Sequence, residues 1–158
     1  MTTTQVISAY ETERNKPMPN RIHGVLQGDL IFLLNLQYRK KYQFPSEVSL
    51  ATTPSSTPDI CIFPKKKLDL MKVEAKETEA PITTIEIQSP SQSPDELVKK
   101  IHQLYFPMGV KSAWLVLPAL KAIQIITPNE QFLFSKGKLK DPITNIELDI
   151  KEIFENLK

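Results

Sequence analysis

Two acidic side chains lie in apolar segments where a carboxylate is unusual. Asp59 opens the apolar run 60–63, and Glu86 lies 27 positions later between two isoleucines. Successive side chains of a strand alternate, so Glu86 and Gln88 should share the face opposite those isoleucines. Burial of a carboxylate is unfavourable unless it is paired, hydrogen-bonded or metal-bound. Mg²⁺ or Mn²⁺ takes one or two protein carboxylates and leaves positions for water and phosphate oxygens, so the two acids together could form a metal site.

The same residues also allow an interpretation without chemistry. Asp59 follows a proline, and Pro-Asp pairs are common in turns, where the aspartate caps the backbone. Glu86 and Gln88 could simply face solvent on an antiparallel strand that buries only its other side. The spacing of the acids alone does not decide between these readings.

Apolar periodicity and turn residues predict a mixed order of helices and strands. Helices are expected at 22–41, 93–109 and 149–158, and strands at 44–51, 58–63, 82–88, 114–117, 122–126 and 131–134, with loops at 52–58 and 64–81. Strands outnumber helices, which predicts an α/β protein with a mixed β-sheet flanked by helices. A chain of 158 residues is large enough for one core, so we expect a single domain over 1–158.

The helix over 93–109 brings two adjacent lysines near the predicted acids. Its apolar positions are Leu97, Ile101, Leu104 and Met108. At about 100° per residue, Lys100 lies about 70° from the centre of this face, whereas Lys99 points roughly opposite to it. Lys100 should therefore reach towards the sheet, and Lys99 should extend into water.

Composition excludes several other classes of function. A formal net charge of +2 is too small to demand a polyanionic partner. There is no glycine-rich phosphate loop, and two histidines with one cysteine do not make a zinc site. The lone Cys61 fits a reducing compartment, and with neither a leader segment nor a membrane span in the sequence, a cytoplasmic location is expected.

Several short motifs together resemble a known family of nucleases. Pro58-Asp59 followed by Glu86-Ile87-Gln88 is similar to the two-part signature of the PD-(D/E)XK superfamily, with glutamine in the lysine position. The surrounding motifs resemble a large bacterial family of restriction-endonuclease-like proteins, and they occur in one order. They are Tyr10-Glu11, His23-Gly24, Pro58-Asp59-Ile60, Ile85 to Ser91, Lys100 before Tyr105, and Gly109 to Val116.

The resemblance implies a metal-dependent nuclease that hydrolyses phosphodiester bonds in DNA. It assigns Mg²⁺ or Mn²⁺ to Asp59, Glu86 and the main-chain carbonyl of Ile87. It also implies an early acid at Glu11, near the site, and a possible homodimer that reaches both strands of a duplex.

The resemblance further implies a lysine two residues after the glutamate that assists the attacking water. Gln88 occupies that position, and an amide can orient water but cannot offset charge on phosphate. Lys100 could replace the lysine, although its interval to Tyr105 is one residue longer than the family pattern. His23 could contact phosphate or orient Glu11, although capping or packing is the more ordinary role for it.

Two alternatives to a nuclease remain open. Gln88 in place of lysine is compatible with a catalytically impaired nuclease-fold module that binds nucleic acid or regulates another protein. Paired carboxylates can also act as acid and base in a metal-independent hydrolase, which requires one acid with a raised pKa.

Overall fold

A six-stranded mixed sheet forms the centre of the computed structural model, which describes residues 16–158. In spatial order its strands are β1 (Tyr42–Gln43), β2 (Ile60–Pro64), β3 (Thr83–Ile87), β4 (Ser112–Leu117), β5 (Ala122–Ile126) and β6 (Gln131–Phe134). Only β3 and β4 run parallel, and the other neighbours are antiparallel. The predicted α/β class with a mixed sheet and flanking helices is confirmed.

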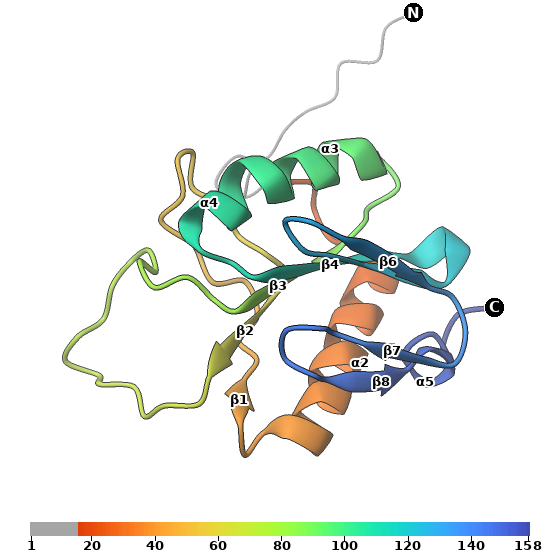
Figure 1. Cartoon of the computed structure of the whole chain (residues 1–158), viewed down its shortest axis with the longest axis horizontal. Helices are drawn as coiled ribbons and strands as arrows, with labels where there is room; N and C mark the ends of the chain where they lie inside the picture. The colour runs from red at the N-terminus through yellow and green to blue at the C-terminus, as the bar shows by residue number, and fades with distance from the viewer. Residues whose placement is uncertain (1–15) are drawn as a thin grey trace, which may run out of the picture.

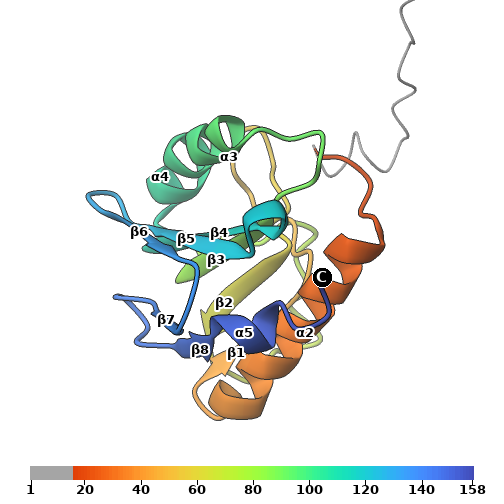
Figure 2. The same cartoon turned by 90° about the vertical axis from the view of Figure 1, so that its right-hand side faces the viewer.

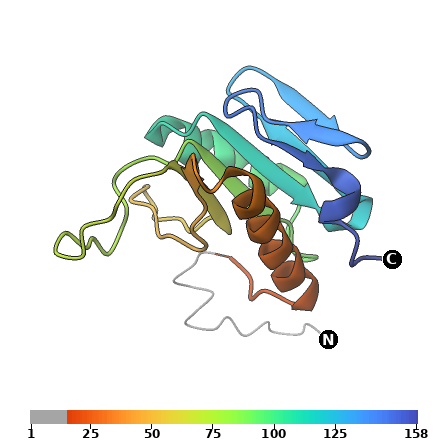
Figure 3. The ribbon, with the colours of Figure 1, turned by 90° about the horizontal axis from the view of Figure 1, so that it is seen from below.

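Helices cover both faces of this sheet (Figures 1 and 2). One face carries the connection between β3 and β4, which consists of α3 (Pro94–Lys100), a π-helix, η1 (Ile101–Tyr105), and α4 (Phe106–Met108). The other face carries α2 (Arg21–Tyr38), which lies across the sheet when the molecule is seen from below (Figure 3). No helix within residues 16–158 combines the length and the apolar character that crossing a bilayer requires.

The two main helices begin at side-chain caps. Asn20 Oδ1 accepts the amide of His23 at 2.9 Å, and Ser93 Oγ accepts the amide of Glu96 at 3.2 Å, as its capping motif predicts. The connection over β3 and β4 ends at Gly109, whose φ of 118° a side chain would oppose. Local sequence therefore fixes where both helices start, next to the edge of the sheet where β3 ends.

Leucines on α2 build the larger part of the core. They are Leu26, Leu30, Leu33 and Leu34, and they pack with Ile85, Ile87 and Trp114 on one face of the sheet. Trp114 is fully buried, as expected for a core residue. The opposite face packs against Ile101 and Tyr105, so the alternation of β3 sends its isoleucines to α2 and Glu86 towards α3 and η1.

Observed and expected elements differ at 44–51, at 138–149 and in the closing helix. The predicted strand 44–51 is wrong: Glu47 adopts a φ of 54°, which breaks an extended segment, and only isolated bridges at Ser46 and Leu50 remain. The hairpin of β7 (Lys138–Lys140) and β8 (Glu147–Asp149) was missed, because three-residue strands carry little alternation. The closing helix is confined to α5 (Ile150–Ile153).

A buried aspartate joins this hairpin region to the sheet. Asp141 Oδ2 accepts hydrogen bonds from Ser112 Oγ and Trp114 Nε1, both at 2.7 Å. Its Oδ1 accepts the amides of Ile143 at 2.7 Å and Thr144 at 3.1 Å. Four donors on one fully buried carboxylate make Asp141 a structural anchor.

Replacement of this anchor should destabilise the fold. We expect Asp141→Ala to lower the free energy of unfolding by about 3 to 5 kcal/mol, because it leaves buried donors without an acceptor. Urea unfolding at constant m-value measures the change. Asp69→Ala, in an exposed loop, is the control and should change stability by about 0.5 kcal/mol or less. Similar losses in both variants would contradict the role assigned to Asp141.

Candidate metal and phosphodiester site

The register of the sheet brings the two predicted acids side by side. β2 and β3 are antiparallel with Ile60 opposite Ile85, so the next pair outward is Asp59 and Glu86. Directly opposed residues of an antiparallel pair share one face of the sheet. Both acids are buried, with exposed fractions of 1% and 2%. The alternative reading, in which Glu86 faces solvent, is therefore excluded.

A proline ends the ladder at this point. Pro58 stands opposite Ile87 in the extended register, and it has no N–H to donate to the Ile87 carbonyl. The Ile87 amide donates to the side chain of Asp59, to Oδ2 at 2.7 Å. Gln27 of α2 donates to the Asp59 carbonyl at 2.9 Å and holds the same turn. The Pro-Asp motif thus places its carboxylate over the end of β3.

Asp59 lies next to Lys16 and His23, which stabilise its ionised form. Lys16 Nζ lies 2.5 Å from its Oδ1, and His23 Nε2 lies 3.0 Å from the same oxygen. Burial alone would raise the pKa of Asp59, but the hydrogen bond from His23 and the charge of Lys16 outweigh it. The pKa of Asp59 therefore falls from its usual 3.8 to about 2. The residue is a carboxylate at neutral pH, as a metal ligand must be.

Glu86 is held by groups from the helix connection. Tyr105 donates its hydroxyl to Oε1 at 3.0 Å, and Lys100 Nζ lies 3.5 Å from Oε2. Lys16 Nζ is 3.8 Å from Oε1, so one ammonium group faces both acids. Burial, followed by the charge of Glu86, raises the pKa of Tyr105 well above 10, which keeps its hydroxyl a donor.

A π-helix explains how Lys100 and Tyr105 reach the same carboxylate. In an α-helix, residues five apart point about 140° away from each other. Here the Phe106 amide donates to the Ile101 carbonyl, a bond from residue i to residue i+5 that widens the turn. The five-residue interval from Lys100 to Tyr105 therefore spans a widened turn, and both side chains stay on one face.

The remaining predicted residues lie in different places. Gln88 is half-buried, and its amide donates to the Gln92 carbonyl at 2.9 Å and not to either acid. Lys99 is exposed, as helical geometry predicted. Glu11 lies outside the described residues.

Three groups at the acids were missed or given another role by sequence reasoning. Lys16 gave no signal, because it precedes α2 in a segment without periodicity. His23 was expected to cap or pack, yet it contacts Asp59. Tyr105 entered only as a spacing marker after Lys100. Side-chain donors from a coil and from a π-helix leave no pattern in a single sequence.

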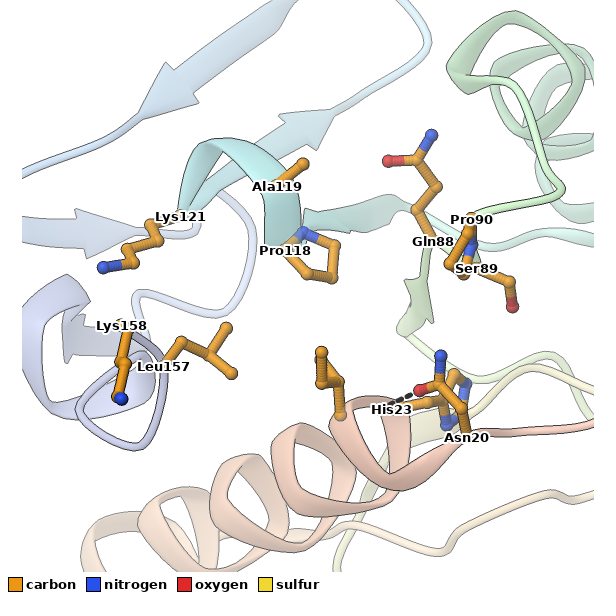
Figure 4. Close-up of a pocket in the computed structure, with 11 residues that line it drawn as sticks. Asn20, His23, Gln88, Ser89, Pro90, Pro118, Ala119, Lys121, Leu157 and Lys158 are labelled. Carbon is orange, nitrogen blue, oxygen red and sulfur yellow. Dashed lines mark hydrogen bonds between the residues drawn. The ribbon is translucent and has the colours of Figure 1, made fainter.

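A pocket of about 600 Å³ has His23, the neighbour of Asp59, in its wall, and the two acids themselves do not line it (Figure 4). Its lining comes from the start of α2, the segments that follow β3 and β4, and the end of the chain. Gln88 and His23 line one side, and Lys121 and Lys158 line the opposite side. Because β3 and β4 are parallel, their carboxyl ends meet here, where open α/β sheets commonly bind ligands.

The donor set suits a hard divalent cation with few protein ligands. Two buried carboxylates already face one shared cation, the ammonium of Lys16. Among the described residues, no three His, Cys, Asp or Glu side chains gather as a metal centre. This composition fits Mg²⁺ or Mn²⁺, which keep several waters, and not a structural zinc ion.

The length of the helix connection can be tested by changing it by one residue. Deletion of the exposed Gln103 should convert η1 into an α-helix and keep both contacts to Glu86. We expect an unchanged or higher melting temperature by circular dichroism. An alanine inserted after Gln103 should turn Tyr105 away and cost about 1 to 3 kcal/mol, because a buried carboxylate loses its donor. Equal losses for deletion and insertion would contradict this account.

The chain was compared with known proteins. Residues 11–147 match the model of the Uma2 family, described as "Putative restriction endonuclease". A solved structure from Anabaena variabilis, titled as a "putative nuclease belonging to DUF820", superposes with a TM-score of 0.72 at 24% identity. The alignment covers 88% of this chain and 83% of that one. No curated protein matched.

These comparisons bear on the fold and on the family separately. The structural likeness establishes a shared architecture, namely the mixed sheet with helices on both faces. The family match spans the segments that carry Asp59, Glu86 and Lys100. This chain belongs to the Uma2 family of restriction-endonuclease-like proteins.

Proposed function

We propose that this protein is a metal-dependent nuclease that hydrolyses phosphodiester bonds in DNA. The observation that carries the proposal is the convergence of two buried carboxylates, Asp59 and Glu86, on one cation at the end of β3. Carboxylates so close together require a positive partner, and the family to which the chain belongs carries the description "Putative restriction endonuclease".

Asp59, Glu86 and the main-chain carbonyl of Ile87 would hold Mg²⁺ or Mn²⁺. When bound, such an ion supplies Lewis acidity towards a phosphate oxygen and lowers the pKa of a water molecule. The chain itself fixes the ligands: the Ile87 amide and His23 orient Asp59, and Tyr105 orients Glu86. Oriented ligands keep the geometry of a metal site.

Lys100 is our candidate for the missing family lysine. Its side chain is 13% exposed, so its ammonium group adjoins Glu86 and still has access to a substrate. It can donate to a phosphate oxygen and offset the negative charge that develops there. Gln88, on the same face of β3, would orient the attacking water through its amide.

The pocket beside the acids would hold the strand next to the scissile phosphate. It continues from His23 to Lys121 and Lys158, which supply positive charge for neighbouring phosphates. Glu11 would contribute a further carboxylate or hold a water molecule. A homodimer would present two such sites to the two strands of a duplex.

A second candidate function follows from the bond made by Gln88. Its amide donates to the Gln92 carbonyl and not to the acid pair, which favours a module that binds DNA with impaired catalysis. The two functions differ in one result. The module would bind DNA in the presence of Mn²⁺ and leave it intact.

Replacement of Glu86 tests the proposed nuclease activity. Glu86→Gln should reduce Mn²⁺-dependent cleavage of plasmid DNA by about a hundredfold or more, because it removes a ligand charge without changing side-chain size. Gel electrophoresis over time measures the rate. Glu152→Gln, at an exposed position of α5, should cleave like the wild type. Full activity of the Glu86 variant would refute the proposed site.

The role of Lys100 is tested against its neighbour. Lys100→Met should lower the cleavage rate by about a hundredfold, because the charge on phosphate loses its counter-ion. Lys99→Met, one position away and exposed, should leave the rate unchanged.

A rescue experiment asks whether the family lysine position is still usable. Gln88→Lys added to the Lys100→Met variant should raise the cleavage rate about tenfold over that of Lys100→Met alone, since strand alternation puts position 88 on the same face as Glu86. Equal rates for Lys99→Met and Lys100→Met would assign no catalytic role to Lys100.

A further inference from the structure

We propose that Lys16 is an internal cation of the acid pair and that metal binding is an exchange, in which the Lys16 ammonium leaves as the divalent ion enters. The inference rests on the metal site of the proposed function. It goes beyond that function by naming a residue that sets the affinity for metal and determines how stable the protein is without it.

The position of Lys16 is the first argument. Its side chain is 4% exposed, and its ammonium group lies 2.5 Å from Asp59 Oδ1 and 3.8 Å from Glu86 Oε1. The other charged neighbour of the pair, Lys100, contacts only Glu86, at 3.5 Å. Lys16 is thus the ammonium group that faces both carboxylates in the described part of the chain.

The second argument is that the Lys16 ammonium group and a divalent ion cannot both lie between the two acids. A divalent ion bound by the same two oxygens lies about 2.0 to 2.1 Å from each. The ammonium group would then stand within a few ångströms of a doubly charged ion, in a buried place where screening by water is weak. Like charges at that distance repel strongly, so one cation must yield.

The chain gives Lys16 freedom to leave. Residues 16–19 belong to no helix or strand, and Met18 and Pro19 are exposed. A lysine carries its charge on a flexible four-carbon stem, so the ammonium group can move out while the backbone stays in place. Tyr105 and His23, by contrast, are fixed on helices and would remain to orient the acids.

Two opposite effects of one substitution distinguish exchange from ordinary structural support. Lys16→Met keeps the stem and removes the charge. In a chelator the variant should melt at a lower temperature, because two buried carboxylates lose their shared cation. In Mn²⁺ titrations by calorimetry, the same variant should bind the metal at least about tenfold more tightly than the wild type. The reason is that no charge-assisted hydrogen bond from Lys16 has to break first.

A surface lysine provides the matched control. Lys66 pairs with Glu79 at 2.8 Å, and both side chains are largely exposed. Lys66→Met should change neither the melting temperature in chelator nor the affinity for Mn²⁺. Weaker or unchanged Mn²⁺ binding by Lys16→Met would overturn the exchange, because a lysine that only supports the fold, or that helps to hold the metal, gives that result.

A measurement on the wild-type protein needs no variant to fold. Lys16 should resist acetylation by an amine-reactive ester in chelator and become severalfold more reactive with saturating Mg²⁺, as read by peptide mass spectrometry. Lys66 should react equally in both conditions. Continued protection of Lys16 in metal-saturated protein would overturn the proposal.

Failure of the inference and failure of the proposed nuclease remain distinguishable. Metal binding with unchanged Lys16 reactivity, together with DNA cleavage, would remove the exchange and keep the nuclease. Exchange without cleavage would keep the inference and remove the nuclease. No Mn²⁺ binding by either the wild type or Lys16→Met would overturn both.

Discussion

Two carboxylates that share one buried end of a sheet must be neutralised, and much of the local structure serves that requirement. Asp59 and Glu86 are direct cross-strand neighbours, an arrangement that is unfavourable for like charges. The coil before α2 supplies Lys16, α2 itself supplies His23, and the connection above the sheet supplies Tyr105 and Lys100. Each of these elements therefore meets the others at the acids.

The fold places the acids where the positive groups that neutralise them can still change position. β3 and β4 are parallel neighbours and end at the pocket, whose wall includes His23, so the buried acids lie at the end of the sheet near open space. The packed core on the α2 face fixes β2 and β3, the two strands that position the acids. Most positive partners of the acids, in contrast, are side chains with long stems or come from coil, which can rearrange when ligands enter.

The sequence predicted most strands of the main sheet, the two acids and the approach of Lys100, but not the other partners of the acids. Alternation identified β3, β5 and β6 nearly to the residue, and the paired acids followed from a proline and an alternating strand. These signals are local, so one sequence contains them. The positive φ at Glu47, the short hairpin at β7 and β8, and the contact between Lys16 and Asp59 depend on tertiary structure.

The widened turn at η1 has a consequence for how spacing along this connection is read. In a regular α-helix an added residue rotates everything beyond it by about 100°. Here a single turn with i→i+5 bonding lets Lys100 and Tyr105, five residues apart, point to the same carboxylate. The separation of two side chains along this connection is therefore better counted in helical turns than in residues.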